Sequence, residues 1–180
     1  GYKIQIIDQH KDKKWKTTLS KALKTKPILV GITSMTGAQL LQAMEVSRFV
    51  KEHSSVPVVW GGVHASIFPE QTIDNPFIDF IIRGEGEIGF RELIHALEDS
   101  KSLGNVPNLV YKKNDKIIQN KCAPFLDLNK IPLPPYHLLN VKSYLHTYFY
   151  NKKVIEIETS RGCPQSCGFC YNKAFNKRKW

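Results

Sequence analysis

The sequence of 180 residues predicts an α/β fold, with an open and doubly wound parallel sheet in its first half. Short runs of strand-forming residues alternate with stretches in which apolar residues recur at helical spacing, an order typical of parallel strands joined by crossover helices. The runs at residues 28–30 and 80–82 are apolar throughout, as expected for strands covered on both faces. The first half is therefore expected to bury a sheet between helices.

Strands are predicted over residues 2–7, 28–33, 56–60 and 78–82. Pro27 and Pro57 stand at the starts of the second and third strands, where a missing amide donor is tolerated. Helices are predicted over residues 38–53 and 87–99, because apolar residues recur there at helical spacing: Leu40, Ala43, Met44 and Val50 in the first, and Phe90, Leu93, Ile94 and Leu97 in the second.

From about Leu103 the pattern changes. Residues 109–111 and 117–119 flank the polar pair Asn114-Asp115 and predict a hairpin. Three prolines within residues 131–136 predict an extended connector, and residues 154–159 predict a further strand. We therefore divide the chain into residues 1–102, a hairpin and Pro-rich connector at 103–152, and a third part at 153–180.

The composition excludes several classes of protein. Four cysteines are too few for a disulfide scaffold of this size, and no apolar run approaches the roughly 18 residues of a membrane span. No signal peptide is visible, so we expect a cytoplasmic protein. The formal net charge of +10 lies at the two ends of the chain, whereas residues 27–99 are acidic overall. This distribution favours a lysine-rich solvated surface over a nucleic-acid interface, for which the best candidate is the basic tail Lys173, Lys177, Arg178 and Lys179.

Small residues follow three of the predicted strands. Ligands of open parallel sheets bind at the carboxyl ends of the strands, and glycine or small hydroxyl residues there let a bulky ligand approach the backbone. Each glycine alone also suits a tight turn, and His64 alone would more often be structural. Their coincidence at one edge nevertheless predicts a ligand site. The candidates are Thr33, Ser34, Met35 and Thr36 after the second strand, Gly61, Gly62 and His64 after the third, and Gly84 and Glu85 after the fourth.

Three cysteines follow the last predicted strand with the spacing Cys-x-x-x-Cys-x-x-Cys: Cys163, Cys167 and Cys170. Zinc generally takes four ligands, commonly as two pairs, but no second pair exists and Cys122 is isolated. A cubic iron–sulfur cluster on three cysteines keeps one iron open for a substrate or cofactor. The spacing therefore predicts a cluster with an open site, and the alternatives are a partial zinc site or reduced structural thiols.

The cysteine run, with Phe169 just before its last member, resembles the radical S-adenosylmethionine (radical SAM) superfamily. The upstream stretches 30–37, 59–66, 69–70 and 83–87 resemble the cobalamin-binding domain of its cobalamin-dependent members. The resemblance covers essentially the whole chain. It implies a truncated Rossmann-like cobalamin-binding sheet, followed by the first strand and cluster loop of a truncated (β/α) barrel.

The resemblance also implies a chemistry. Cys163, Cys167 and Cys170 would hold a [4Fe-4S] cluster whose open iron binds S-adenosylmethionine, with Phe169 near the adenine. Reduction by a protein such as flavodoxin or ferredoxin would cleave the sulfonium and yield a 5′-deoxyadenosyl radical, which abstracts hydrogen from an unidentified small molecule or peptide. Cobalamin, held at the strand ends named above, would usually carry a methyl group to an unactivated carbon. The resemblance thus implies a methyltransferase, although ring formation and other rearrangements remain open, and it assigns no catalytic side chain.

One motif departs from the family pattern. Many cobalamin domains carry an Asp-x-His-x-x-Gly loop that supplies the lower cobalt ligand. Asp8-Gln9-His10 matches its start, but Lys13 stands where glycine is needed. We therefore interpret His10 as a loop residue and leave the lower ligand open.

Two other functions share parts of this pattern. A tRNA methylthiotransferase has a similar layout but holds a second cluster on three cysteines in its amino-terminal domain, whereas residues 1–121 here contain no cysteine. A non-catalytic corrinoid carrier needs no cluster, which the three cysteines argue against. The length also predicts a fragment, because a doubly wound domain needs about five strands and a complete barrel roughly 250 residues. We expect this chain alone to be inactive.

Overall fold

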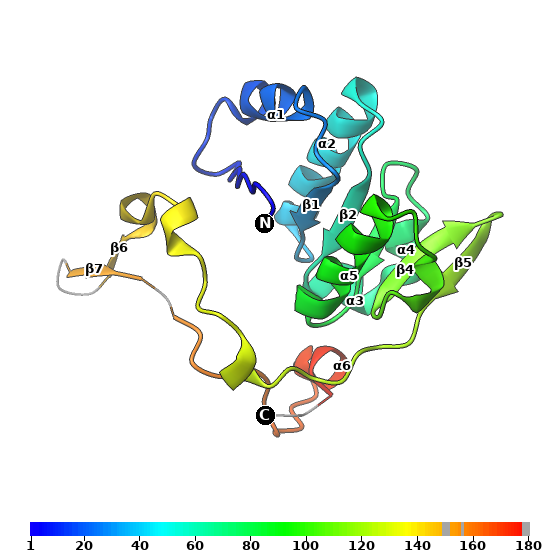
Figure 1. Ribbon diagram of the computed structural model, residues 1–180. Helices are drawn as coiled ribbons and strands as arrows, with labels where there is room; N and C mark the ends of the chain where they lie inside the picture. The colour runs from blue at the N-terminus through cyan, green and yellow to red at the C-terminus, as the bar shows by residue number, and fades with distance from the viewer. Residues whose placement is uncertain (149–151, 156, 178–180) are drawn as a thin grey trace.

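The computed structural model describes residues 1–148, 152–155 and 157–177, and its main body is a five-stranded sheet (Figure 1). The strands are β1 (Val30–Thr33), β2 (Val58–Gly61), β3 (Phe80–Ile82), β4 (Leu109–Lys113) and β5 (Lys116–Gln119), and they lie side by side in chain order. The pairs β1–β2 and β2–β3 are parallel, whereas β3–β4 and β4–β5 are antiparallel. The predicted α/β fold is confirmed, and the hairpin adds an antiparallel edge to the parallel strands.

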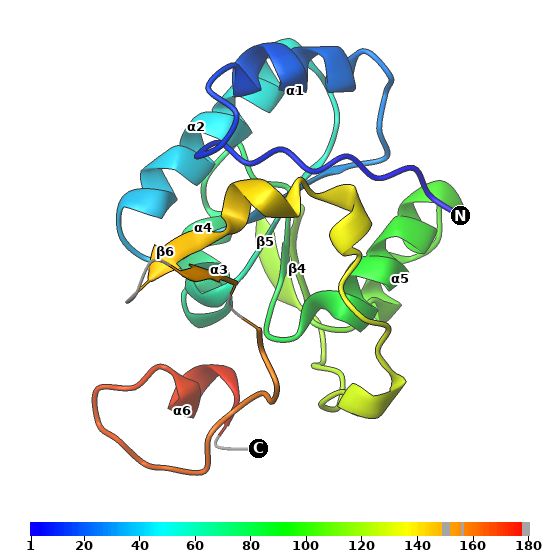
Figure 2. The same cartoon turned by 90° about the vertical axis from the view of Figure 1, so that its left-hand side faces the viewer.

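Helices cover both faces of the sheet (Figure 2). One face packs against α1 (Trp15–Leu23), α2 (Ala38–His53), α3 (Val63–Ile67) and α4 (Pro69–Ile73), and the core between them contains Leu19, Val50, Val58, Trp60, Ala65, Ile73 and Ile81. The other face packs against α5 (Gly86–Glu98), with a core that contains Val59, Ile82, Leu93, Ala96 and Leu109. Side chains alternate along each strand, so β2 contributes to both cores. The sheet is therefore doubly wound, as predicted.

The helix α5 covers one face over β3 and β4 and leaves β1 open. Phe80, Ile82 and Leu109 share the core of α5. Gly31 and Thr33, on the same face of β1, are exposed. Because α5 covers only part of this face of the sheet, a hollow remains beside α5, over β1.

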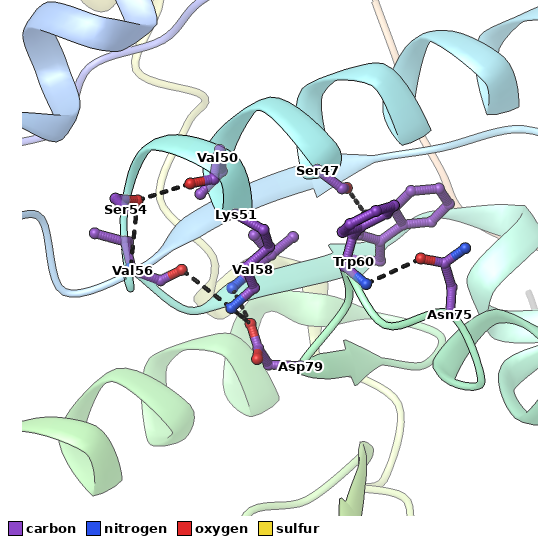
Figure 3. Close-up of polar contacts among 10 residues, drawn as sticks. Ser47, Val50, Lys51, Ser54, Val56, Val58, Trp60, Asn75 and Asp79 are labelled. Carbon is purple, nitrogen blue, oxygen red and sulfur yellow. Dashed lines mark hydrogen bonds and ion pairs between the residues drawn. The ribbon is translucent and has the colours of Figure 1, made fainter.

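At the amino end of the strands, polar groups form a paired network (Figure 3). Asp79 Oδ2 accepts a hydrogen bond from the Val58 amide at 2.6 Å and forms an ion pair with Lys51 Nζ at 2.6 Å. Lys51 Nζ also donates to the carbonyl of Val56 at 3.4 Å. Farther along β2, toward its carboxyl end, Trp60 Nε1 donates to Ser47 Oγ of α2 at 2.8 Å. These bonds connect α2 with β2 and with the residue before β3, so they set the position of the main crossover helix.

The predicted elements of the first half agree with the structure with two exceptions. The helix at 38–53 has the predicted bounds, the second helix begins one residue earlier, and the three parallel strands begin at Val30, Val58 and Phe80, after the predicted starts. The strand predicted at residues 2–7 is wrong. A strand needs a hydrogen-bonding partner, and residues 2–7 pair with no strand of the described sheet. They form an extended segment, with Ile4 and Ile6 exposed, that reaches α5 where the Tyr2 hydroxyl donates to Glu98.

Helix α1 is absent from the prediction, although its apolar residues were a readable signal. Trp15, Leu19, Ala22 and Leu23 follow helical spacing, and Leu19 and Leu23 are buried against the sheet. The lysines among them made the segment look like a solvated charge run. A lysine-rich exposed face and a buried apolar stripe are compatible in one amphipathic helix.

The predicted hairpin is confirmed. Asn114 and Asp115 have φ angles of 49° and 59°, which a two-residue turn between right-twisted strands requires. Because β4 is hydrogen-bonded to β3, the hairpin belongs to the sheet. The division of the chain at residues 102 and 152 stays a prediction. The pairing of β4 with β3 joins the hairpin, which we assigned to the connector, to the sheet of the first part.

The rest of the chain is irregular with short elements. Single 3-10 turns lie at Leu103–Asn105, Leu128–Lys130, Tyr136–Leu138 and Val141–Tyr144, and α6 (Asn172–Phe175) follows the cysteines. The strand predicted at 154–159 is wrong in its bounds, because β7 (Lys152–Val154) pairs with β6 (His146–Tyr148) and ends at Val154. Glu156 lies outside the described residues, and 157–159 have no regular structure. No helix in the described ranges is long and apolar enough to cross a membrane.

Candidate functional site

A cleft of about 460 Å³ opens at the carboxyl end of the parallel strands, on the face that α5 leaves uncovered. Its volume lies within the range of ordinary ligand pockets. Five of its lining residues are glycines, and the full lining is Gly31, Ile32, Thr33, Val59, Trp60, Gly61, Gly62, Ile82, Gly84, Gly86, Glu87 and Phe90. The cleft therefore has an apolar floor on which the backbone of two strands is accessible.

Gly31 and Gly62 keep this cleft open in different ways. A Cβ on Gly31 would lie 3.3 Å from the ring of Phe90, so the missing side chain leaves space between β1 and α5. Gly62 has a φ of +88°, and a Cβ there would lie 2.6 Å from the Ser34 carbonyl oxygen. The turn after β2 therefore touches the turn after β1, and only glycine permits both the backbone conformation and the contact.

The Ser34 side chain lies at this contact and is fully buried. Its backbone is bonded on both sides, since its amide donates to the Gly61 carbonyl and its carbonyl accepts from the His64 amide. Its Oγ has no hydrogen-bond partner, and among the described residues only Arg83 Nε shares this state. A buried hydroxyl without a partner costs stability, and a polar ligand group at the strand end would satisfy it.

His64 and Thr36 form a polar pair beside Ser34. Thr36 Oγ1 lies 3.0 Å from His64 Nδ1, and the His64 ring is buried. Burial lowers the pKa of His64 below its usual value, so its imidazole is neutral at neutral pH. A neutral imidazole can donate from one nitrogen and accept at the other, which suits uncharged polar ligand groups.

Ser66 connects two of the glycine turns. Its hydroxyl donates to the Gly62 carbonyl at 2.7 Å and accepts from the Gly84 amide at 2.8 Å. Gly84 has a φ of +66°, and a Cβ there would meet nothing within 4 Å, so the backbone conformation is what requires glycine. The turns after β2 and β3 are thus held together by one side chain.

The structure brings most of the residues predicted at the strand ends to one place. Thr33, Gly61, Gly62 and Gly84 line the cleft, and Ser34, Thr36 and His64 lie beside it. Met35 is 52% exposed and lines neither this cleft nor the second, smaller cavity beside Glu85. Glu85 lines a second cavity of about 160 Å³ and accepts a hydrogen bond from the Leu126 amide at 2.9 Å. Its carboxylate therefore contacts the connector.

The sequence analysis did not name eight of the cleft residues as site residues. Six of them lie in the stretches that resemble the cobalamin-binding domain (Gly31, Ile32, Val59, Trp60, Gly86 and Glu87), and two lie outside these stretches (Ile82 and Phe90). The glycine within the first parallel strand was a usable signal, since an interior glycine often marks a close approach of another group. The apolar residues among them have the composition of buried core residues. Whether such a residue lies in the core or in the cleft depends on how much of the sheet α5 covers.

The three cysteines lie on the segment between β7 and α6. Cys163 and Cys170 are partly exposed, Cys167 and the distant Cys122 are exposed, and all four are free thiols. Nowhere in the described ranges are three His, Cys, Asp or Glu side chains arranged to hold a metal ion. The Cys170 amide donates to the Cys167 carbonyl, and Phe169 is 95% exposed. Three thiols are suitable ligands for an iron–sulfur cluster, and their approach to a common metal site stays a prediction.

Two further predicted features have simple outcomes. His10 lies in a turn before α1, and its amide donates to Asp8 Oδ1 at 2.8 Å, which agrees with a loop residue. Lys173 and Lys177 of the basic tail lie on or next to α6, while Arg178 and Lys179 lie outside the described residues. Binding of nucleic acid by this tail is untested.

Comparison with known proteins identifies the class of this glycine-lined α/β site. Residues 1–94 match the family model of the B12 binding domain. The match covers more than half of the chain, which therefore belongs to the B12-binding domain family. One relative of this chain, the cobalamin-dependent radical SAM methyltransferase TokK of Streptomyces tokunonensis, is 32% identical over 71% of this chain and 19% of its own length, in agreement with the resemblance read from the motifs.

The alignments with individual relatives cover most of this chain but less than half of each relative's own length. An uncharacterized methyltransferase of Pyrococcus horikoshii is 34% identical over 98% of this chain and 39% of its own length. An anaerobic magnesium-protoporphyrin IX monomethyl ester cyclase of Synechocystis is 31% identical over 82% and 30%. A solved structure of the radical SAM methyltransferase TsrM from Kitasatospora setae, with cobalamin and a [4Fe-4S] cluster bound, matches 67% of this chain and 25% of the TsrM chain. The TM-score is 0.58 and the sequence identity is 22%, which shows a shared fold.

Proposed function

We propose that this chain binds a corrinoid in the cleft and forms part of a cobalamin-dependent radical SAM methyltransferase. The observation that carries the proposal is the glycine-lined cleft, with the buried Ser34 hydroxyl beside it that has no partner among the described residues, on the same chain as a Cys-x-x-x-Cys-x-x-Cys segment. Membership of the B12-binding domain family supports the corrinoid. The cluster and the methyl transfer rest on the cysteines and on what the relatives are named for.

The residues of the cleft have separate tasks in this proposal. The glycines of β1 and of the two following turns let a large ring or its side chains approach the backbone. Ser34 offers a buried hydroxyl, and the Thr36–His64 pair offers uncharged donors and acceptors. The apolar residues of the floor exclude water from the ligand surface that they cover.

Cys163, Cys167 and Cys170 are the ligands proposed for a [4Fe-4S] cluster with one open iron, and Phe169 is the residue proposed to contact the adenine of S-adenosylmethionine. When bound, these cofactors would supply one-electron cleavage of S-adenosylmethionine, and cobalamin would supply a methyl group. An external one-electron reductant such as flavodoxin or ferredoxin completes the set. The thiols lie on one exposed loop, so they can be brought together by rearrangement of that loop.

A second candidate reaction comes from the cyclase among the relatives, at 31% identity. Ring formation would begin with the same step, hydrogen abstraction from the substrate by the 5′-deoxyadenosyl radical. It would differ from methyl transfer in how the substrate radical then reacts. We favour methyl transfer because the relative of 34% identity that covers 98% of this chain is named a methyltransferase.

The corrinoid site is tested with Gly31→Leu, which places a side chain on the floor of the cleft, next to Phe90. Hydroxocobalamin binding, measured by equilibrium dialysis and visible absorbance, is expected to weaken at least about tenfold, because the added side chain fills ligand space. Thr17→Leu, at an exposed position of α1, is the matched control and should bind like the wild type. Equal binding by Gly31→Leu and wild type contradicts this site.

The cluster site is tested by anaerobic reconstitution with iron and sulfide. Replacement of Cys163, Cys167 and Cys170 by Ala together should abolish the charge-transfer absorbance and the electron paramagnetic signal of the reduced cluster. Cys122→Ala, which removes the one cysteine outside the motif, should keep both. A cluster that persists in the triple variant would exclude these ligands.

A further inference from the structure

Arg161, two residues before Cys163, is surrounded by three carboxylates. Its Nη1 lies 2.7 Å from Glu87 Oε1 and 3.6 Å from Glu85 Oε1, and its Nε lies 3.2 Å from Glu158 Oε2. The Arg161 side chain is 29% exposed and that of Glu85 is 12% exposed. Ion pairs shielded to this degree are less screened by water and salt than pairs on the surface.

The carboxylates come from two different parts of the molecule. Glu85 lies in the turn between β3 and α5, and Glu87 lies in the first turn of α5 and also lines the cleft. Glu158 lies in the cysteine segment itself, three residues from Arg161, and is 66% exposed. The Arg161 side chain therefore joins the wall of the cleft to the segment that holds the cysteines.

The turn that receives Arg161 is held firmly by its other contacts. The Glu85 carbonyl accepts from Asn108 Nδ2 at 2.9 Å, and Glu85 Oε2 accepts from the Leu126 amide at 2.9 Å. Without a guanidinium between them, the carboxylates of Glu85 and Glu87 would face each other as like charges. The start of α5 and the turn before it thus offer Arg161 an acidic site that is bonded to the rest of the sheet domain, whereas the described cysteine segment has no regular secondary structure before α6.

We propose that Arg161 is a positioning residue that couples the two cofactor regions: by pairing with Glu85 and Glu87 it holds the cysteine segment against the wall of the cleft, so that ligand binding in the cleft orders that segment. The coupling part of this inference rests on the proposed function. Glu87 is the physical link, because it touches both the cleft and Arg161. A ligand that contacts Gly84, Gly86 and Glu87 restrains this turn, and less freedom is then lost when Arg161 docks.

The pairing is tested on the full chain without cofactors by hydrogen–deuterium exchange of peptides from residues 157–170. Glu87→Gln removes the carboxylate that α5 contributes to the Arg161 guanidinium, whereas Glu158→Gln removes a carboxylate that binds the same guanidinium from within the cysteine segment. Exchange should rise by about fivefold in Glu87→Gln and in Arg161→Gln, and should change less than about twofold in Glu158→Gln. Circular dichroism verifies that each variant is folded.

A charge reversal separates pairing from a general loss of structure. Arg161→Glu alone should raise the exchange of residues 157–170 further, because three carboxylates would then surround a fourth. Combining it with Glu87→Arg should return exchange toward the wild-type value, since the pair is restored with opposite polarity. Equal exchange in Glu87→Gln and Glu158→Gln, or no recovery in the reversed pair, would overturn the pairing.

The coupling is tested by repeating the exchange with hydroxocobalamin. Bound hydroxocobalamin should lower the exchange of residues 157–170 by about fivefold in the wild type, and this protection should disappear in Arg161→Gln. By reciprocity, Arg161→Gln should bind hydroxocobalamin more weakly by the same factor. Binding to the wild type without protection overturns the coupling alone. No binding to the wild type overturns the proposed function and the coupling, while the cofactor-free variants still decide the pairing.

Discussion

The same three parallel strands end in two different environments. At their amino ends, Lys51, Asp79 and the Val58 amide satisfy one another at distances near 2.6 Å, and side chains fill the space between α2 and the sheet. At their carboxyl ends, glycines leave a cleft, and the buried Ser34 hydroxyl has no partner within the described residues. The amino end is built for stability, while the carboxyl end gives up contacts that a ligand can supply. Substitutions at the two ends should therefore separate folding from binding.

Asp79→Ala should have the largest effect, on stability. It leaves the buried Val58 amide and the Lys51 ammonium without their shared acceptor, which should lower the free energy of unfolding by about 3 kcal/mol. Urea denaturation followed by circular dichroism measures this change. Asp79→Asn keeps an acceptor oxygen and should lose less. Hydroxocobalamin affinity of the folded fraction should be unchanged, and a loss of affinity would mean that the two ends are not independent.

Ser34→Ala should show the opposite behaviour. It removes a buried hydroxyl to which no described residue is hydrogen-bonded, so the free energy of unfolding should stay the same or rise by up to about 1 kcal/mol. Hydroxocobalamin should bind about fivefold to tenfold more weakly, because a hydrogen bond to the ligand is lost. Dialysis and urea denaturation on the same preparation measure both quantities. Weaker folding with unchanged binding would assign Ser34 to the scaffold.

His64 should give the smallest effect, as a pH dependence of stability. Its folded-state pKa lies below the usual value of 6.5 because burial disfavours the imidazolium, so the unfolded chain binds the proton more tightly. The free energy of unfolding should therefore fall as the pH drops below about 6.5 and level off below the folded pKa. Denaturation at pH 7.5 and 5.5 measures the loss, which should shrink in His64→Gln. An equal loss in this variant would assign the dependence to other groups.

Much of the fold was readable because local pattern and tertiary context agree. Residues 38–53 carry a helical apolar stripe and form that helix, and Asn114-Asp115 supply the positive φ angles that the hairpin needs. Residues 2–7 have strand-forming composition but no described partner, and composition cannot reveal a missing partner. Helix α1 was missed because its lysines concealed a buried stripe that includes Leu19 and Leu23.

The candidate site divides in the same way. The glycines and hydroxyl residues that follow the strands were readable, since parallel strands bring their carboxyl ends to one edge. Gly31 and Glu87 were not singled out within the stretches that resemble the cobalamin-binding domain, and Phe90 lay outside them, because their place in the cleft depends on where α5 lies over the sheet. Glu85 was expected at the cofactor, yet its carboxylate contacts Leu126 and Arg161, and no sequence spacing specifies that pairing.

The sequence by itself determined the three parallel strands, the helices at 38–53 and 86–98, the hairpin, the glycine turns at one sheet edge and the three-cysteine motif, because these depend on backbone conformation and on short spacings along the chain. Only the tertiary structure decided that α5 leaves β1 open, that the Ser34 hydroxyl is buried with no partner among the described residues, and that Arg161 reaches the cleft wall. Those features depend on the packing and pairing of residues that lie far apart in the sequence, where many arrangements are compatible with the same local pattern.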